Sequence, residues 1–175
     1  MPATVNTNTQ KLNWVNGWVT AMAAFSNAGS GTYAAGNVLL DGTGNYLVFP
    51  ESTCRSGMVI GATLMRHTSI AADFDLFLFD SPPTNQTDNS AIALLDADLS
   101  KLVGVYEFKT ANKKAGAAST MDVYRGVDVS NTVYAPFPYT GTLYGLLVIR
   151  TGALTPAATL NVIRLACDIT AVAAT

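Results

Sequence analysis

The residues best placed for chemistry are three carboxylates, Asp73, Asp75 and Asp80, around the Phe- and Leu-rich run of DFDLFLFDSPP. Side chains alternate along a β-strand, so Asp73 and Asp75 share a face with Phe77 and Phe79. The two acids are close enough to share a cation, but Ca²⁺ needs six to eight oxygen ligands, and the loop that would supply them is missing. We therefore predict no metal site. We expect both acids at a solvated face or rim, and both Phe rings under a second sheet or a neighbouring subunit.

The other residues that an active site would need are scarce. His67 is the only histidine, so a catalytic triad would have to use it, and no nucleophile elbow lies nearby. A glycosidase needs two carboxylates facing a cleft, and the only glutamates are Glu51 and Glu107. An enzyme would have to combine Glu107 with Asp73 or Asp75. No such pair has a clear context, and we expect no catalytic residue, no cofactor and no enzyme activity.

The composition limits the possible partners. Only 13% of the residues are charged, against roughly a quarter in typical soluble domains. A surface so poor in charge suits a subunit that buries much of itself against neighbours. The net charge is −2 and no basic run exceeds Lys113-Lys114, so we expect no nucleic-acid partner. The apolar run Leu143–Ile149 is too short to cross a bilayer, and the polar start lacks a signal-peptide core, so we expect no membrane partner. Cys54 and Cys167 are interpreted as reduced thiols of a chain made in a cytoplasm.

The pattern along the chain predicts an all-β fold. Residues 1–13 are Thr- and Asn-rich and are expected to form an extended arm, with residues 14–175 as a single domain. Trp14–Phe25 is ambiguous between helix and strand, and we favour a strand. Short apolar runs at regular spacing then predict further strands. These are Val38–Leu40, Tyr46–Phe49, Met58–His67, Phe74–Phe79, Leu102–Phe108, Met121–Tyr124, Val133–Phe137, Leu143–Arg150 and Ala158–Cys167.

These runs fit an antiparallel β-sandwich of about eight strands with jelly-roll-like topology. The turn DGTGN predicts a hairpin between the runs that end at Leu40 and Phe49. A second hairpin is expected between Met58–His67 and Phe74–Phe79. One short helix is predicted over Asp96–Leu102, with Asp96 as its N-cap.

Aromatic residues offer one further kind of site. Stacked rings bind sugars, but nothing in the spacing groups these residues, and core or interface positions explain them equally well. The residues in question are Trp14, Trp18, Tyr33, Tyr124, Tyr134 and Tyr139.

The segments TYAAGNVLL, DFDLFLFDSPPTNQTDNSAIALLDADLSKLVGVYEF and GTLYGLLVIRTGALTPAATLNV resemble a group of small structural proteins encoded by tailed bacteriophages near their head genes. The resemblance covers most of residues 32–165 and leaves out the first 31. It implies a virion subunit without catalytic residues. Within that group, a capsid decoration (cement) protein fits best, trimeric and bound to the major capsid protein where capsomers meet.

Two regions are expected to make the contacts. The arm suits strand addition to a neighbour's sheet edge, and the stretch Thr110–Thr120 is expected to be an exposed basic loop. The predicted interface residues are Val5, Leu12, Trp14, Trp18, Lys109, Lys113 and Lys114. Three alternatives stay open: a tail, fibre or baseplate module that binds host glycan, a small jelly-roll glycan hydrolase, and the shell protein of a small icosahedral virus. The missing basic arm argues against the last.

Overall fold

A computed structural model describes residues 18–26, 31–40, 46–49, 56–66, 71–115, 122–126, 137–154 and 160–168. Its elements are almost all strands. In chain order they are β1 (Trp18–Ser26), β2 (Val38–Leu39), β3 (Leu47–Phe49), β4 (Ser56–Arg66), β5 (Asp73–Phe79), α2 (Asp96–Leu99), β6 (Leu102–Phe108), the 3-10 helix η1 (Thr110–Asn112), β7 (Lys113–Ala115), β8 (Asp122–Arg125), β9 (Phe137–Thr140), β10 (Leu143–Thr151) and β11 (Leu160–Asp168).

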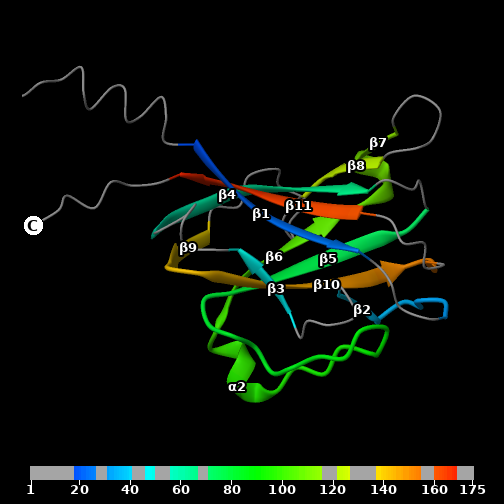
Figure 1. The fold of residues 1–175 in the computed structure, drawn as a ribbon, viewed down its shortest axis with the longest axis horizontal. Coiled ribbons are helices and arrows are strands. Elements are labelled where there is room, and N and C mark those ends of the chain that lie inside the picture. Colours follow the sequence, from blue (N-terminus) through cyan, green and yellow to red (C-terminus); the bar gives the residue numbers. More distant parts are fainter. Residues whose placement is uncertain are drawn as a thin grey trace, which may run out of the picture.

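The strands form two antiparallel sheets that pack face to face (Figure 1). One sheet has the order β1-β11-β4-β8-β7, with β9 also paired to β4. The other has the order β2-β10-β5-β6, with β3 also paired to β10. The predicted all-β antiparallel sandwich is therefore confirmed.

One set of strand pairs is nested along the chain, and the pairs of β4 with β11 and of β5 with β10 join these nested pairs into the two sheets. The first strand pairs with the last, β2 and β3 pair with β10, β4 pairs with β8 and β9, and β5 pairs with β6. A chain that folds as one long hairpin and then rolls up has this order, as in a jelly roll with its two Greek keys. The nested order favours the predicted jelly-roll-like connection, which we keep as an interpretation.

Both predicted hairpins are wrong. β4 and β5 belong to different sheets, so the chain crosses from one sheet to the other between them. β2 and β3 do not pair with each other. Both pair with β10, one after the other along its length, since Val38 lies opposite Val148 and Phe49 lies opposite Leu143. Turn-forming residues marked where these strands end, but the apolar pattern does not say which strand is the partner.

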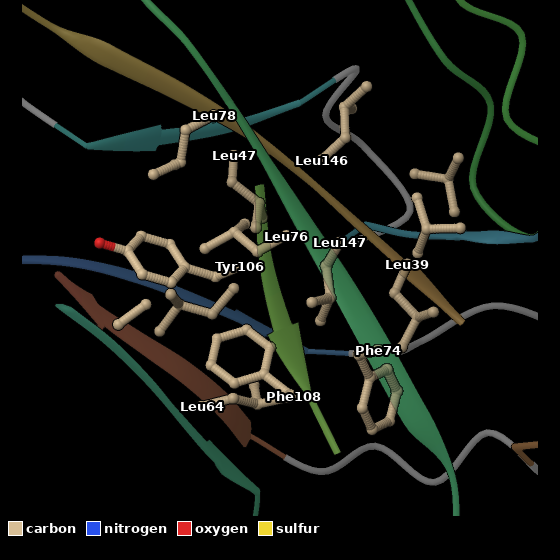
Figure 2. Packing of buried hydrophobic residues seen from close by; sticks show 14 of the residues in the cluster. Leu39, Leu47, Leu64, Phe74, Leu76, Leu78, Tyr106, Phe108, Leu146 and Leu147 are labelled. Carbon is tan, nitrogen blue, oxygen red and sulfur yellow. The ribbon is translucent and has the colours of Figure 1, made fainter. Parts of the chain in front are cut away.

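The core lies between the two sheets, and β5 shows how the sequence fills it. Phe74, Leu76 and Leu78 are fully buried and alternate with the partly exposed Asp73, Asp75 and Phe77. Figure 2 shows this inward set with residues from both sheets, such as Leu64 of β4 beside Phe108 of β6. The alternation predicted for this strand is confirmed.

The outer face of the same sheet is covered by the chain's own loop. Residues 80–101 lie on the side of β10 and β5 that faces away from the other sheet (Figure 1). Phe77 and Phe79 share that outer face, and Phe79 is fully buried. The second sheet therefore does not cover these two rings, and the predicted alternative, cover by a neighbouring subunit, stays a prediction. The second half of β5 is nevertheless apolar on both faces for the predicted reason, because it is covered on both sides.

Some expectations are refined. Trp18–Ser26 is a strand, as favoured. The helix is shorter than predicted, and its N-cap is Leu95 instead of Asp96, because the buried Asp98 side chain turns back to the Leu95 amide. The stretch from Thr110 is not all loop, since η1 and β7 begin it.

The arm 1–13 lies outside the described residues, and the division into arm and single domain stays a prediction. In the described part of the chain, no helix has the length and apolar character needed to cross a membrane.

Candidate functional site

The acids singled out in the sequence meet on the outer face of the β10-β5-β6 sheet. Asp75 on β5 lies opposite Glu107 on β6 and opposite Val148 on β10. Directly opposed residues share a face, so the two carboxylates lie side by side on the face that points away from the core. For Asp75, the strand alternation predicts this outward direction. We call Asp75, Glu107, Lys109 and Arg150 the outer charged cluster.

Arg150 reaches this cluster because β10 is irregular there. The register of β10 against β5 shifts between Ile149 and Thr151, which leaves Arg150 as the extra residue of a bulge. Its Nη1 lies 3.0 Å from Asp75 Oδ2 and 2.8 Å from Glu107 Oε1. On the other side, Lys109 Nζ lies 2.7 Å from Glu107 Oε2. Two cations therefore match two carboxylates, and three neighbouring strands are joined through their side chains.

The protonation of Asp75 reflects two opposing influences. Burial raises the pKa of Asp75, and the hydrogen bond and charge of Arg150 oppose that rise. The same hydrogen bond to Asp75 raises the pKa of Arg150, so the arginine stays charged. A carboxyl group with a raised pKa can act as a general acid. Here, however, an arginine bridges both acids and occupies the space between them.

Asp73 has a different task. Its Oδ1 accepts hydrogen bonds from the backbone N–H and the hydroxyl of Thr110, each 2.6 Å long. Partial burial alone would raise the pKa of Asp73, but these hydrogen bonds and the Lys109 charge outweigh it and lower the pKa. The acid thus holds the first turn of η1 against the start of β5. Among the described residues, no group of three His, Cys, Asp or Glu side chains could hold a metal ion.

A second polar cluster lies between the sheets, and the sequence analysis missed it. Arg66 is only 1% exposed and lies with its guanidinium carbon 5.2 Å from the centre of the Phe74 ring. Asp122 lies opposite Arg66 in the register of β8 and β4, and Lys113 Nζ lies 3.0 Å from Asp122 Oδ2. Burial lowers the pKa of Arg66 to about 10. The alternation of Ala62, Leu64 and Arg66 was the available signal, because it places the arginine on the inward face.

The loop of residues 80–101 holds a third set of buried polar groups. Asp98 is fully buried and accepts hydrogen bonds from the amides of Leu95 (3.0 Å) and Thr84 (2.9 Å) and from Lys101 Nζ (3.1 Å). Burial alone would raise the pKa of Asp98, but these donors outweigh it and hold the pKa far below its ordinary value. Gln86 makes three further hydrogen bonds, to Thr84 and to both backbone groups of Ala93.

This pinned loop exposes two large apolar side chains. Leu95 is 57% exposed and Leu99 is 63% exposed, at the two ends of α2. The helix is drawn at the far tip of the loop, away from both sheets (Figure 1). An exposed leucine is ordinary by itself, but two on a loop fixed by buried hydrogen bonds make a preformed apolar contact. We call Leu95, Leu99 and the residues of α2 between them the α2 tip.

The predicted interface lysines are placed as follows. Lys109 and Lys113 each form an ion pair within the chain, with Glu107 and Asp122, and Lys114 is exposed on β7. Trp18 is the first residue of β1. Val5, Leu12 and Trp14 lie outside the described residues. The role of all seven in contacts stays a prediction.

Of the six aromatic residues considered for sugar stacking, the structure describes the side chains of Tyr33 and Tyr124, and neither is available for stacking. Tyr33 and Tyr124 are fully buried, with Tyr124 edge-on to Phe74. A different pair lies on the outer surface: Tyr46 and Tyr144 are partly buried, and their ring centres are 5.3 Å apart in an edge-to-face arrangement. Tyr144 lies on β10 and Tyr46 just before β3, and the strand register brings their rings together. The spacing of these residues in the sequence does not predict this contact.

Comparisons with known proteins add little. No protein-family model matches the chain. No curated protein matches it in sequence. Among solved structures, the chain is similar to one of the "Israeli acute paralysis virus heated to 63 degree - full particle", with 11% identity over 96% of this chain and 73% of that chain, and a TM-score of 0.31. A TM-score this low carries no argument about fold or function. The function must therefore be argued from the residues.

Proposed function

We propose that the chain is a structural protein of a bacteriophage virion, specifically a capsid decoration (cement) protein. In this proposal it is made in the host cytoplasm and assembles with its own copies, as a trimer. It then binds the major capsid protein between capsomers on the capsid surface. Because it binds the assembled shell and not the separated subunits, it stabilises the shell by mass action. The sequence resemblance supports this class of function.

The observation that carries the proposal is the α2 tip. Buried hydrogen bonds of Asp98 and Gln86 hold the loop of residues 80–101 in place. On this loop, the large apolar side chains of Leu95 and Leu99 face solvent. A rigid contact loses little conformational entropy on binding, so a small apolar surface can contribute more affinity. The major capsid protein is the partner that the proposal assigns to this surface.

The charges of the chain support a contact that is mainly non-ionic. Lys109 and Lys113 are already matched by acids of the same chain, and only 13% of all residues are charged. A decoration protein that held its shell through lysines would lose affinity in salt, because exposed charges are screened. We therefore expect head binding to persist at high ionic strength.

The outer charged cluster supports a structural role over a hydrolytic one. A retaining or inverting glycosidase needs two carboxyl groups with substrate or water between them. Between Asp75 and Glu107 lies the Arg150 guanidinium, within 3.0 Å of one and 2.8 Å of the other. We assign no hydrolase activity to the pair, and a loss of some measured activity in Asp75→Asn with fold and oligomer intact would contradict that.

The proposal is tested by adding the purified protein to phage heads that lack it. We expect saturable binding at many copies per head and a higher temperature of head disruption. Leu95→Ser with Leu99→Ser should weaken binding at least about tenfold, with little change in the protein's own stability. Val48→Ser is the matched control, because Val48 is another exposed apolar residue (44%), placed on β3 instead of α2. Absence of head binding by the wild-type protein would overturn the proposal.

One observation favours a second candidate, a tail module that binds host glycan. The edge-to-face pair of Tyr46 and Tyr144 lies near the exposed Val48 on the outer face, and sugar rings stack on such aromatic surfaces. A glycan array separates the two functions. A specific glycan signal that Tyr144→Ala abolishes, together with no binding to heads, would favour the tail module.

A further inference from the structure

The strand β1 forms one edge of the six-stranded sheet, and nothing in the described chain pairs with its outer side. Within the described strands it pairs only with β11, through nine consecutive residue pairs from Trp18 opposite Asp168 to Ser26 opposite Leu160. The register contains no bulge. A regular strand of nine residues has a straight row of N–H and C=O groups on its free side, spanning about 30 Å.

The edges formed by β2 and β7 are protected. β2 is closed by the long loop, since the Val38 amide donates to Ser90 O and the Asn89 amide donates to Val38 O. β7 is only three residues long, and two of them are Lys113 and Lys114. Short strands and lysines are the usual means of preventing edge-to-edge pairing. β1 has neither: its sequence, WVTAMAAFS, contains no charged residue, no proline and no glycine.

An unprotected edge of this length points to a strand that covers it in the assembled protein. At least 17 residues precede Trp18, so the arm 1–13 is joined to β1 by the four residues of Trp14–Gly17. Fully extended, 13 residues reach about 43–47 Å, which exceeds the length of the β1 edge. The arm is rich in threonine with Val5 among the first residues, and β-branched residues favour extended strands.

We propose that the arm 1–13 of a second copy of this chain adds as a strand to the free edge of β1. Pairing with a second copy keeps the arm extended, whereas pairing with its own β1 would reverse the chain at Asn16-Gly17, a dipeptide that favours hairpin turns. The proposed self-association is what favours the second copy. Since the same donor and acceptor exist on every copy, the contact can repeat head to tail, and it forms a ring where the rotation between copies closes. The inference deepens the self-association in the proposed function and rests on it.

The test combines amide hydrogen exchange with the mass in solution, both on the full-length protein. In an edge strand, every second amide points away from its only partner and exchanges quickly, whereas a strand paired on both sides protects all its amides. We expect all β1 amides to be protected in a particle whose mass is a whole-number multiple of 18.4 kDa.

Thr7→Pro with Thr9→Pro removes two amide donors from the arm without touching the described sheets. The mass should then fall to 18.4 kDa, and alternate β1 amides should exchange at least about tenfold faster. Thr7→Ser with Thr9→Ser is the matched control and should behave like the wild type, because it keeps both donors.

Three results would overturn the inference. Rapid exchange of alternate β1 amides in the wild type would show that the outer edge of β1 is unpaired. A monomer with every β1 amide protected would place the arm on its own β1, by a reversal at Asn16-Gly17. An oligomer whose mass and β1 protection are insensitive to the prolines would be held by another contact. If the prolines lower the mass and expose the β1 amides as expected but the wild type does not bind heads, only the decoration function is contradicted.

Discussion

Replacing Asp98 tests whether the α2 tip is held by the buried network that the structure shows. Asp98→Ala removes the acceptor of three hydrogen bonds, from the amides of Leu95 and Thr84 and from Lys101 Nζ. Hydrogen bonds to a charged group contribute about 1.5–3 kcal/mol each, so three set an upper range of about 4.5–9 kcal/mol. The Lys101 side chain is 31% exposed, and water can reach donors in a loop, so we expect a loss of about 3 kcal/mol.

The assay is urea unfolding of the purified full-length protein at neutral pH. Asp96→Ala is the matched control, because Asp96 lies in the same helix but is exposed, and such surface changes usually stay within about 0.5 kcal/mol. A loss below about 1 kcal/mol for Asp98→Ala, or an equal loss for both variants, would refute the reasoning.

The pH dependence gives an independent check of the same network. The pKa of Asp98 is lowered in the folded protein, below the value of about 3.9 in an unfolded chain. The stabilisation is therefore complete above that unfolded value and is lost as the pH falls below it. The difference in unfolding free energy between wild type and Asp98→Ala should narrow below about pH 4.

Three further changes probe other parts of the sandwich by the same unfolding assay. Gly145→Ala should cost about 1–3 kcal/mol, because the new Cβ would lie 2.9 Å from a Phe49 ring carbon, whereas Gly61→Ala, whose Cβ would meet no atom of the other described residues within 4 Å, should cost nothing. Arg150→Met should cost about 1 kcal/mol at low salt and less in about 1 M salt, because the Arg150 side chain is 49% exposed and salt can screen its charge. Arg66→Met should leave stability within about 1 kcal/mol or increase it, because two of the buried guanidinium nitrogens, Nε and Nη1, have no hydrogen-bond partner among the described residues; a loss above about 2 kcal/mol would contradict this.

The sequence predicts individual strands well, because the alternation of apolar and polar residues within a strand reflects which of its faces is buried. Leu102–Phe108 was predicted with the bounds that β6 has, and the alternation of Asp and apolar residues in β5 gave the correct faces. The residue pattern of a strand does not identify the strand with which it pairs. The run Phe74–Phe79 looks the same whether it pairs with β4 or, as it does, with β6 and β10.

The candidate sites were predictable in part for the same reason. The pairing of Asp75 with Glu107 was considered, but Arg150 enters from a strand far along the chain and only through a bulge. Asp98 lies within the predicted helix Asp96–Leu102, yet one of its hydrogen-bond donors, Thr84, lies 14 residues earlier in the loop. Contacts of this kind depend on the path of the loop, which no periodicity describes.

The most direct test of the decoration function is to measure binding of the purified protein to phage heads that lack it, after its mass in solution has been determined by light scattering behind a sizing column. We expect a stable oligomer, a multiple of 18.4 kDa, that binds heads at many copies and raises the temperature at which they open. A monomer that does not bind heads would show that the chain is not a decoration protein.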